Sequence, residues 1–355
     1  MAEPRLKVAL VFGGRSGEHE VSVRSAAAVA AALAQTHDVL PLLIDKQGLW
    51  LLQEGTAPQS TGGVPVFLAP HPGDQGRLRR LDSAAPAASP DIYFPVLHGP
   101  YGEDGAIQGL FELAAVPYVG AGVAASAAGM DKELMKALFA HARVAQGPYR
   151  VLRGRDAAVE AAILRELGLP LFVKPANLGS SVAVSKVKAA AGLGPALHAA
   201  LEYDRKVLVE AAIDCRELEI AILGNDEPEA SLPGEVIPDR EFYDYDSKYS
   251  PESRTRLVIP AELEGALRRD AQELGVRAFR AIDACGYARV DFFLERQTGR
   301  LLVNEINTIP GFTSISMFPK MWEAAGLPYA QLVTRLVRLG LERHAQRARL
   351  RTAYA

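Results

Sequence analysis

The chain has 355 residues, of which 49% are hydrophobic and 23% charged, as is typical of a folded globular protein. The net charge of -3 gives no broad positive surface for nucleic acid, and the Arg-rich C-terminal stretch is equally explained as a helix end. No run of about 18 apolar residues occurs, and the N-terminal apolar run is too short for a signal peptide. We therefore expect a cytoplasmic protein with no nucleic-acid or membrane partner.

Only two cysteines occur, Cys215 and Cys285. Two are too few for a disulfide framework or a cysteine-based zinc site, which fits a reducing compartment. We interpret both as core residues.

The first third of the chain has the pattern of an α/β domain. An apolar strand ending in glycines, "LKVALVFGG", precedes an Ala-rich helix over 20–35 and a second strand over 37–45. A Gly, Pro and Ser-rich tract over 54–90 is expected to form loops around a short hairpin. A strand over 91–99 and a helix over 104–114 then restore the α/β pattern. The pattern predicts a βαβ unit at the start of the fold.

The middle of the chain contains a loop that could cover a phosphate. A helix is expected from about Met130, followed by two strand-like runs within 171–187 that are joined by "NLGSS". Lys174 ends the first run, and Gly179, Ser180 and Ser181 offer backbone N–H groups and hydroxyls to an anion. No Walker A or dinucleotide fingerprint is present. An ordinary Gly-Ser turn explains the loop as well.

Two further segments could close around a ligand. Glu210 and Glu217 lie in two strand-like runs within 207–223, where they could accept hydrogen bonds from an adenosine, although charges at strand ends look the same. The segment "EFYDYDSKYS", 241–250, is unusually rich in tyrosine. Such a loop either closes over a polar ligand or is simply packed.

Residues 288–307 predict a β-hairpin that brings two carboxylates together. The three-residue loop 297–299 contains a glycine suited to a left-handed turn. If Arg296 then faces Arg300, Asp291 lies opposite Glu305. Like charges directly opposite each other repel unless a cation or a shared proton lies between them.

The residue types around this pair indicate a hard metal ion. Glu305 and Asn307, two residues apart in one strand, point to the same face as Asp291 does. Asp, Glu and Asn oxygens without His or Cys suit magnesium or manganese. The alternative is an amphipathic hairpin whose acidic face is in water.

The ordered motifs resemble one known family. "GGRSGEHEVS", "HGPYGEDGAIQG", "MDK", "KPANLGSS", "FYDYDSKY", "RVDFF" and "NEINTIPGFTSIS" run over nearly the whole chain. In this order they resemble the D-alanine:D-alanine ligases of the ATP-grasp superfamily. The resemblance implies a three-domain ATP-grasp fold, with a Rossmann-like α/β domain over 1–120, a central domain over 121–213 and a C-terminal domain over 214–355.

The resemblance also implies a reaction for peptidoglycan precursor synthesis. The carboxylate of one D-alanine attacks the γ-phosphate of ATP, and the amine of a second D-alanine displaces phosphate from the resulting acylphosphate. Two Mg2+ or Mn2+ ions on the ATP phosphates would be held by Asp291, Glu305 and Asn307, with Glu305 bridging both ions. A homodimer is usual for this family.

The remaining roles implied by the resemblance concern ATP and the two amino acids. Lys132, Lys174 and Ser181 would bind the ATP phosphates, and Glu210 and Glu217 the adenosine. By the same resemblance, Glu18 would bind the ammonium of the first D-alanine, with His98 close by, and Arg289 and the Gly311 N–H would form the oxyanion hole. Lys248 and Ser316 would bind the carboxylate of the second D-alanine. Ser180 and Tyr249 would hydrogen-bond with Glu18 and hold the closing loop shut.

Two positions depart from the expected pattern. Ala183 stands where we expect glycine, and Ala211 stands where some members carry a lysine near adenine. Two other functions stay open. The first is another ATP-grasp carboxylate:amine ligase or a D-alanine:D-lactate ligase, although Tyr249 disfavours the ester-forming enzymes. The second is a nucleotide-binding regulatory protein that has lost catalysis.

Overall fold

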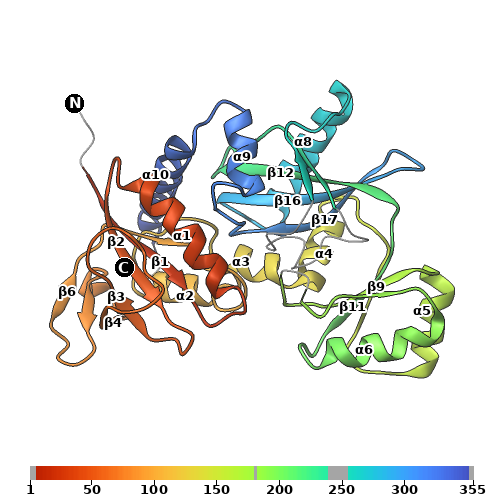
Figure 1. The fold of residues 1–355 in the computed structure, drawn as a ribbon, viewed down its shortest axis with the longest axis horizontal. Helices are drawn as coiled ribbons and strands as arrows, with labels where there is room; N and C mark the ends of the chain where they lie inside the picture. The colour runs from red at the N-terminus through yellow and green to blue at the C-terminus, as the bar shows by residue number, and fades with distance from the viewer. Residues whose placement is uncertain (1–4, 180–181, 239–254, 352–355) are drawn as a thin grey trace.

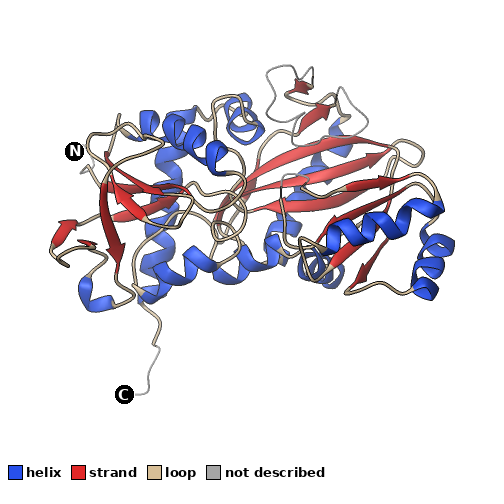
Figure 2. Cartoon of the chain, turned by 60° about the horizontal axis from the view of Figure 1, so that its bottom comes forward, coloured by secondary structure: helices blue, strands red, loops and turns tan. Residues whose placement is uncertain are grey.

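The computed structural model describes residues 5–179, 182–238 and 255–351. These residues form three β-sheets with helices packed on their faces, so the expected α/β class is confirmed. Figure 1 shows the N-terminal sheet at one end, with the strands β12, β16 and β17 and the smaller sheet containing β9 and β11 at the other. A second view shows the same separation (Figure 2). Among the described residues, no helix is both long and apolar enough to cross a membrane.

The N-terminal sheet has seven strands in the order β6-β5-β4-β3-β2-β1-β7. Strand β1 lies between β2 and β7 and is parallel to both, with α1 crossing between β1 and β2, so the predicted βαβ unit is confirmed. Its bounds are β1 Lys7–Gly13, α1 His19–Leu33, β2 Asp38–Ile44, β7 Ile92–Pro95 and α2 Ala106–Leu113. Parallel strands covered on both faces need continuous apolar sequence, and residues 8–12 are fully buried.

The tract over 54–90 differs from its prediction. It forms three strands rather than loops around one hairpin, and together with β3 these extend the sheet beyond β2 in antiparallel pairs. The strands are β3 Trp50–Leu52, β4 Val64–Leu68, β5 Leu78–Arg80 and β6 Pro86–Ala88, with a 3₁₀ turn at Pro72–Asp74. Strands of three to five residues between Gly and Pro breakers are too short to show a clear alternation in the sequence.

A four-stranded antiparallel sheet follows, in the order β10-β9-β11-β8. Helices α5 and α6 cover it and close a separate apolar core. Its elements are β8 Tyr149–Leu152, α5 Ala157–Leu167, β9 Leu171–Pro175, β10 Ser185–Val187, a 3₁₀ turn at Ala190–Gly192, α6 Leu193–Leu201 and β11 Val207–Ala211. The two strands predicted on either side of the Gly-Ser loop, β9 and β10, are therefore confirmed and pair directly.

The largest C-terminal element is a six-stranded antiparallel sheet built on β12 and β16. Its strands are β12 Cys215–Gly224, β13 Glu229–Ala230, β14 Gly234–Ile237, β15 Arg256–Val258, β16 Gly286–Glu295 and β17 Leu301–Asn307. One face is apolar and is covered by α3, α4 and α8. The opposite face is apolar at one end, where α9 packs on it, and carries charged side chains at the other end.

The helices of this half are α3 Val123–Met130, α4 Lys132–His141, α8 Gly265–Ala281, α9 Met317–Ala324 and α10 Tyr329–Ala348. The helix predicted from about Met130 is confirmed as α4, and α3, which was not predicted, ends just before Asp131. The Asp131 carboxylate caps α4 by accepting hydrogen bonds from the backbone N–H groups of Glu133 and Leu134. The last helix, α10, packs against α1 of the N-terminal domain (Figure 1). The domain limits proposed from the sequence stay a prediction.

The β16–β17 hairpin places Asp291 opposite Glu305, as predicted, although the predicted turn was wrong. Glu295 and Arg300 form the closing pair, so the connection has four residues rather than three. Gly299 has the predicted left-handed conformation, with φ of 69°. A β-bulge at Asn304 then shifts the register by one residue and restores the Asp291–Glu305 pair. The two differences cancel at the carboxylates.

Candidate functional site

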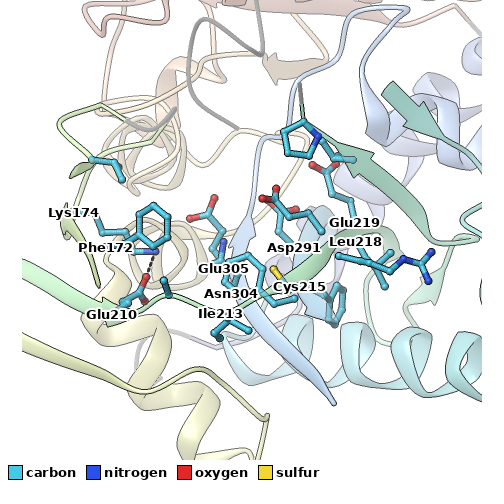
Figure 3. Close-up of a pocket in the computed structure, with 18 of the residues that line it drawn as sticks. Phe172, Lys174, Glu210, Ile213, Cys215, Leu218, Glu219, Asp291, Asn304 and Glu305 are labelled. Carbon is cyan, nitrogen blue, oxygen red and sulfur yellow. Dashed lines mark ion pairs between the residues drawn. The ribbon is translucent and has the colours of Figure 1, made fainter. Parts of the chain in front are cut away.

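A cavity of about 850 Å³ lies between the four-stranded and six-stranded sheets. Its size is in the range of small-molecule sites. Figure 3 shows Lys174 and Glu210 on one side and Glu219, Asp291 and Glu305 on the other. The chain between β11 and β12 crosses from one sheet to the other at residues 212–214, which line the cavity as well.

We call the side formed by Glu219, Arg289, Asp291 and Glu305 the acidic wall. These residues project from β12, β16 and β17 on the same face, because Glu219 pairs with Asp291 and Asp291 pairs with Glu305. The Arg289 guanidinium donates to both Asp291 oxygens at 2.6 and 2.7 Å, and its Nε lies 3.1 Å from Glu219 Oε2. Burial opposes the charge of Arg289, but the carboxylates of Asp291 and Glu219 outweigh it and raise the pKa of Arg289 well above its usual value.

The donor set of the acidic wall fits a divalent metal ion. Asp291 and Glu305 offer carboxylate oxygens, and Asn307, beside the wall on β17, adds an amide whose Nδ2 donates to Asp291 Oδ2 at 3.1 Å. Within the described ranges, no three His, Cys, Asp or Glu side chains are grouped as metal ligands. Carboxylate oxygens of this kind suit a cation such as magnesium, which takes its other ligands from phosphates and water.

We call the opposite side, formed by Lys132, Lys174 and Glu210, the basic wall. Lys174 Nζ lies 2.5 Å from Glu210 Oε2. Lys132 Nζ donates to the carbonyl oxygen of Leu178 at 2.7 Å and lies 3.9 Å from Glu305 Oε2. Burial lowers the pKa of Lys132, with the Glu305 carboxylate opposing this shift. For Lys174 burial also disfavours the charge, but the Glu210 carboxylate outweighs it and raises the pKa.

A second group of predicted residues meets where the N-terminal sheet contacts the loop after β17. Glu18 is the N-cap residue of α1, as expected from its position before the helix. His98 is 5% exposed, and its Nδ1 lies 3.0 Å from the carbonyl oxygen of Ile309, while its Nε2 lies 3.3 Å from Ser25 Oγ. Burial lowers the pKa of His98, although the Glu18 carboxylate opposes this, so the imidazole is neutral near pH 7.

Glu103, which sequence reasoning did not single out, belongs to this second group. Its Oε1 accepts a hydrogen bond from the backbone N–H of Gly99 at 2.8 Å. Burial and the nearby Glu18 carboxylate raise the pKa of Glu103 to about 8. The motif "HGPYGEDG" contained the signal, because its acidic residues follow a buried histidine, but nothing in the sequence showed that one of them faces Glu18.

The loop after β17 brings Gly311 and Ser316 to the same region. Ser316 precedes α9, and its Oγ lies 2.7 Å from Thr313 Oγ1 and accepts from the Thr313 N–H at 3.1 Å. Gly311 lies next to Ser316, since a Cβ built on it would be 3.2 Å from Ser316 Oγ. The Phe312 N–H approaches Ser25 Oγ at 3.4 Å, which ties this loop to α1.

The structure therefore gathers the described predicted residues in two neighbouring places. Glu217 lines the cavity together with Asp291, Glu305, Lys132 and Lys174, whereas Asn307 is not among its lining residues. Glu219 is a lining carboxylate that the sequence did not indicate. Ser180, Ser181, Lys248 and Tyr249 lie outside the described residues.

The structure also describes Ala183, Ala211 and the two cysteines. Ala183, found where glycine was expected, has a left-handed φ of 56°, a conformation that glycine adopts without strain. The expectation that both cysteines are core residues was wrong, because Cys215 and Cys285 are only partly buried. Ala211 lines the cavity at the end of β11, as does Glu210 before it.

Two antiparallel sheets enclose a cavity with one acidic and one basic wall, and they are joined to an N-terminal α/β domain that begins with a parallel βαβ unit. This arrangement defines an ATP-grasp enzyme. The model of the D-ala D-ala ligase N-terminus matches residues 7–121, and that of its C-terminus matches residues 138–338. The chain belongs to the D-alanine–D-alanine ligase family.

Individual relatives match over nearly their full length. Curated proteins named D-alanine--D-alanine ligase are 50% identical in Heliobacterium modesticaldum, with 96% of each chain covered, and 48% identical in Halothermothrix orenii, with 95% of this chain and 99% of the relative covered. Among solved structures, the D-alanine-D-alanine ligase of Coxiella burnetii is 36% identical, with a TM-score of 0.84 and 97% and 96% coverage. The VanG D-Ala:D-Ser ligase of Enterococcus faecalis is 33% identical, with a TM-score of 0.85 and 95% and 100% coverage.

Proposed function

We propose that the chain joins two D-alanine molecules into D-alanyl-D-alanine, with conversion of ATP to ADP and phosphate, as a step of peptidoglycan precursor synthesis. Two observations together carry this proposal. The family match covers nearly the whole chain, and Lys132, Lys174, Asp291 and Glu305 of the family motifs line one cavity. The relatives at 46–50% identity are all named for D-alanine, which favours this substrate over D-lactate or D-serine.

The two walls support a division of labour on the nucleotide. We assign the ATP phosphates to Lys132, Lys174 and Ser181, and the adenosine end to Glu210 and Glu217. Asp291, Glu305 and Asn307 would hold the divalent metal, which we propose to be two Mg2+ or Mn2+ ions. When bound, the metal offsets the negative charge of the phosphates during phosphoryl transfer. The lysines orient the same oxygens from the opposite side.

The second group of residues supports a site for the amino acids. Glu18 would accept the ammonium of the first D-alanine, with the neutral His98 beside it. Arg289 and the Gly311 N–H would stabilise the oxyanion that forms when the second amine attacks the acylphosphate. We assign the carboxylate of the second D-alanine to Lys248 and Ser316.

The closing loop is the part of this proposal that rests on the sequence motifs alone. Ser180 and Tyr249 would hold it over Glu18, so that water is kept from the acylphosphate. We also propose a cytoplasmic homodimer, and a division into domains at 1–120, 121–213 and 214–355.

The test is a paired assay of phosphate and dipeptide. With ATP and a divalent metal, D-alanine is expected to give one phosphate per D-alanyl-D-alanine, whereas L-alanine gives neither product. Offering D-lactate or D-serine together with D-alanine distinguishes the related ligases. A depsipeptide or a D-alanyl-D-serine product formed in preference to the dipeptide would contradict the proposed substrate, and no nucleotide turnover with any amino acid would contradict catalysis itself.

A further inference from the structure

Lys136 is a buried lysine that the proposed mechanism does not use. It lies on α4, one helical turn after Lys132, and is 2% exposed. It does not line the cavity, whereas its partner Glu210 does. A fully buried lysine is rare unless it is paired, because removing an ammonium from water is costly.

Glu210 is held between two lysines from different elements. Lys136 Nζ lies 2.9 Å from Glu210 Oε1, and Lys174 Nζ lies 2.5 Å from Glu210 Oε2. Each oxygen of the carboxylate thus has its own ammonium partner. The Lys136 ammonium also lies 5.1 Å from the ring centroid of Tyr149 on β8, a cation–π distance.

The consequence for Lys174 is geometric. A carboxylate with one charged partner can rotate around it, but a carboxylate fixed at both oxygens presents each oxygen in one direction. Burial alone would favour protonation of Glu210, yet the two lysines lower its pKa to about 2, so it stays ionised. Lys174 therefore meets a fixed anion at the edge of the nucleotide cavity.

We propose that Lys136 is a positioning residue for nucleotide binding: it anchors Glu210 from behind, and Glu210 in turn holds the Lys174 ammonium toward the ATP phosphates. This inference rests on the proposed function only for the role of Lys174. It adds to the site a residue that never touches the substrate.

The first experiment compares two buried lysines. Lys136→Met keeps the length of the side chain and removes its charge, so KM for ATP should rise about tenfold, the size of one lost charge-assisted hydrogen bond, while KM for D-alanine stays unchanged. Lys206→Met is the matched control, because Lys206 is 4% exposed and pairs with Asp131 and Glu133 outside the cavity. The control should lower Tm without raising KM for ATP.

A second background separates positioning from a general loss of structure. If Lys136 acts through Lys174, Lys136→Met should raise KM for ATP in the wild type but not in a Lys174→Met chain, where nothing is left to position. An equal rise in both backgrounds, or an unchanged KM for ATP in a Lys136→Met chain with lowered Tm, would overturn the proposal.

Two provisions keep the test decisive. If Lys136→Met does not fold, the double variant Lys136→Met/Glu210→Gln, which leaves no buried carboxylate without its partner, is compared with Glu210→Gln alone. The proposal requires the same KM for ATP in both, because Lys136 acts only through the Glu210 carboxylate. Calorimetry of ADP binding to the same variants makes the comparison without turnover. A failure of ligation in the wild type would contradict the proposed function, whereas an unchanged ADP affinity in the Lys136 variants would contradict this inference alone.

Discussion

The two walls of the cavity are opposite in charge and differ in how they are built. The acidic wall gathers three carboxylates around one guanidinium on adjacent strands of a single sheet. The basic wall takes Lys132 from a helix and Lys174 and Glu210 from the smaller sheet. Lys136, which does not line the cavity, pairs with Glu210 from the same helix as Lys132. One wall is thus fixed by strand register and the other by packing between elements.

This difference matches the two charges of a metal–nucleotide complex. Carboxylates on one side suit the cation, and ammonium groups on the other suit the phosphates. Each wall alone therefore carries charge that its own residues do not neutralise. A ligand carrying both charges can satisfy the two walls together. The comparison predicts that changes in each wall affect different ligands.

The largest effect is expected where the acidic wall loses the Arg289 guanidinium. Arg289→Gln removes a charged hydrogen-bond partner from the largely buried carboxylates of Asp291 and Glu219, so the free energy of unfolding should fall by about 3 kcal/mol. Urea denaturation measures this. Arg335→Gln is the control, because Arg335 forms an exposed ion pair with Glu229 and should cost less than about 1 kcal/mol. Equal losses would show that the acidic wall is wet and not a preformed site.

Loss of a proposed metal ligand should abolish most ligation without unfolding the chain. Glu305→Gln keeps the size of the side chain but removes the charge opposite Asp291, and kcat/KM should fall by about 100-fold or more, since even indirect partners of a metal matter by 10- to 100-fold. Phosphate release is measured against magnesium concentration, with Tm as the control for folding. Near-normal turnover at low magnesium would refute this ligand.

A residue outside both walls should affect neither the metal nor the nucleotide. Glu18→Gln is expected to raise KM for D-alanine about tenfold, because the substrate ammonium loses its charged partner. The affinity for ADP should stay that of the wild type, as measured by calorimetry. A defect confined to nucleotide binding would remove Glu18 from the amino-acid site.

The two walls can be set against each other by omitting the metal. With EDTA present, Lys174→Met should weaken ADP binding, whereas Glu305→Gln should tighten it by about 1 kcal/mol, because one carboxylate that repels the phosphates is gone. With magnesium present, both variants should bind ADP more weakly. If Glu305→Gln has the same sign under both conditions, the acidic wall does not act through a metal.

The smallest effect concerns the titration of Glu103. Its pKa of about 8 in the folded state is raised above the usual 4.5, so between these values the folded chain holds a proton that the unfolded chain has lost. The contribution of Glu103 to stability is therefore greatest below pH 4.5 and falls as pH rises toward 8. Glu103→Gln should flatten the decline of Tm from pH 5 to pH 8. An identical decline in both chains would show that Glu103 is ionised throughout.

Local patterns in the sequence were enough to find the carboxylates of the acidic wall. Alternation places Asp291, Glu305 and Asn307 on one face of their strands whatever surrounds them. The pairing across the hairpin was predicted for an incorrect reason, because a longer turn and a bulge at Asn304 compensated for each other. Neither could be predicted, since a bulge depends on how the strand fits its neighbours and not on its own residue types.

The sequence by itself determined the βαβ start, the main strands and the position of Glu18 before α1, because these follow from periodicity and from helix-end preferences within a few neighbouring residues. Only the tertiary structure decided that Lys136 and Lys174, 38 positions apart, meet at Glu210, and that Glu219 joins Arg289. Those contacts join elements distant in the chain, and the free energy that fixes a buried ion pair depends on what surrounds it and not on sequence spacing.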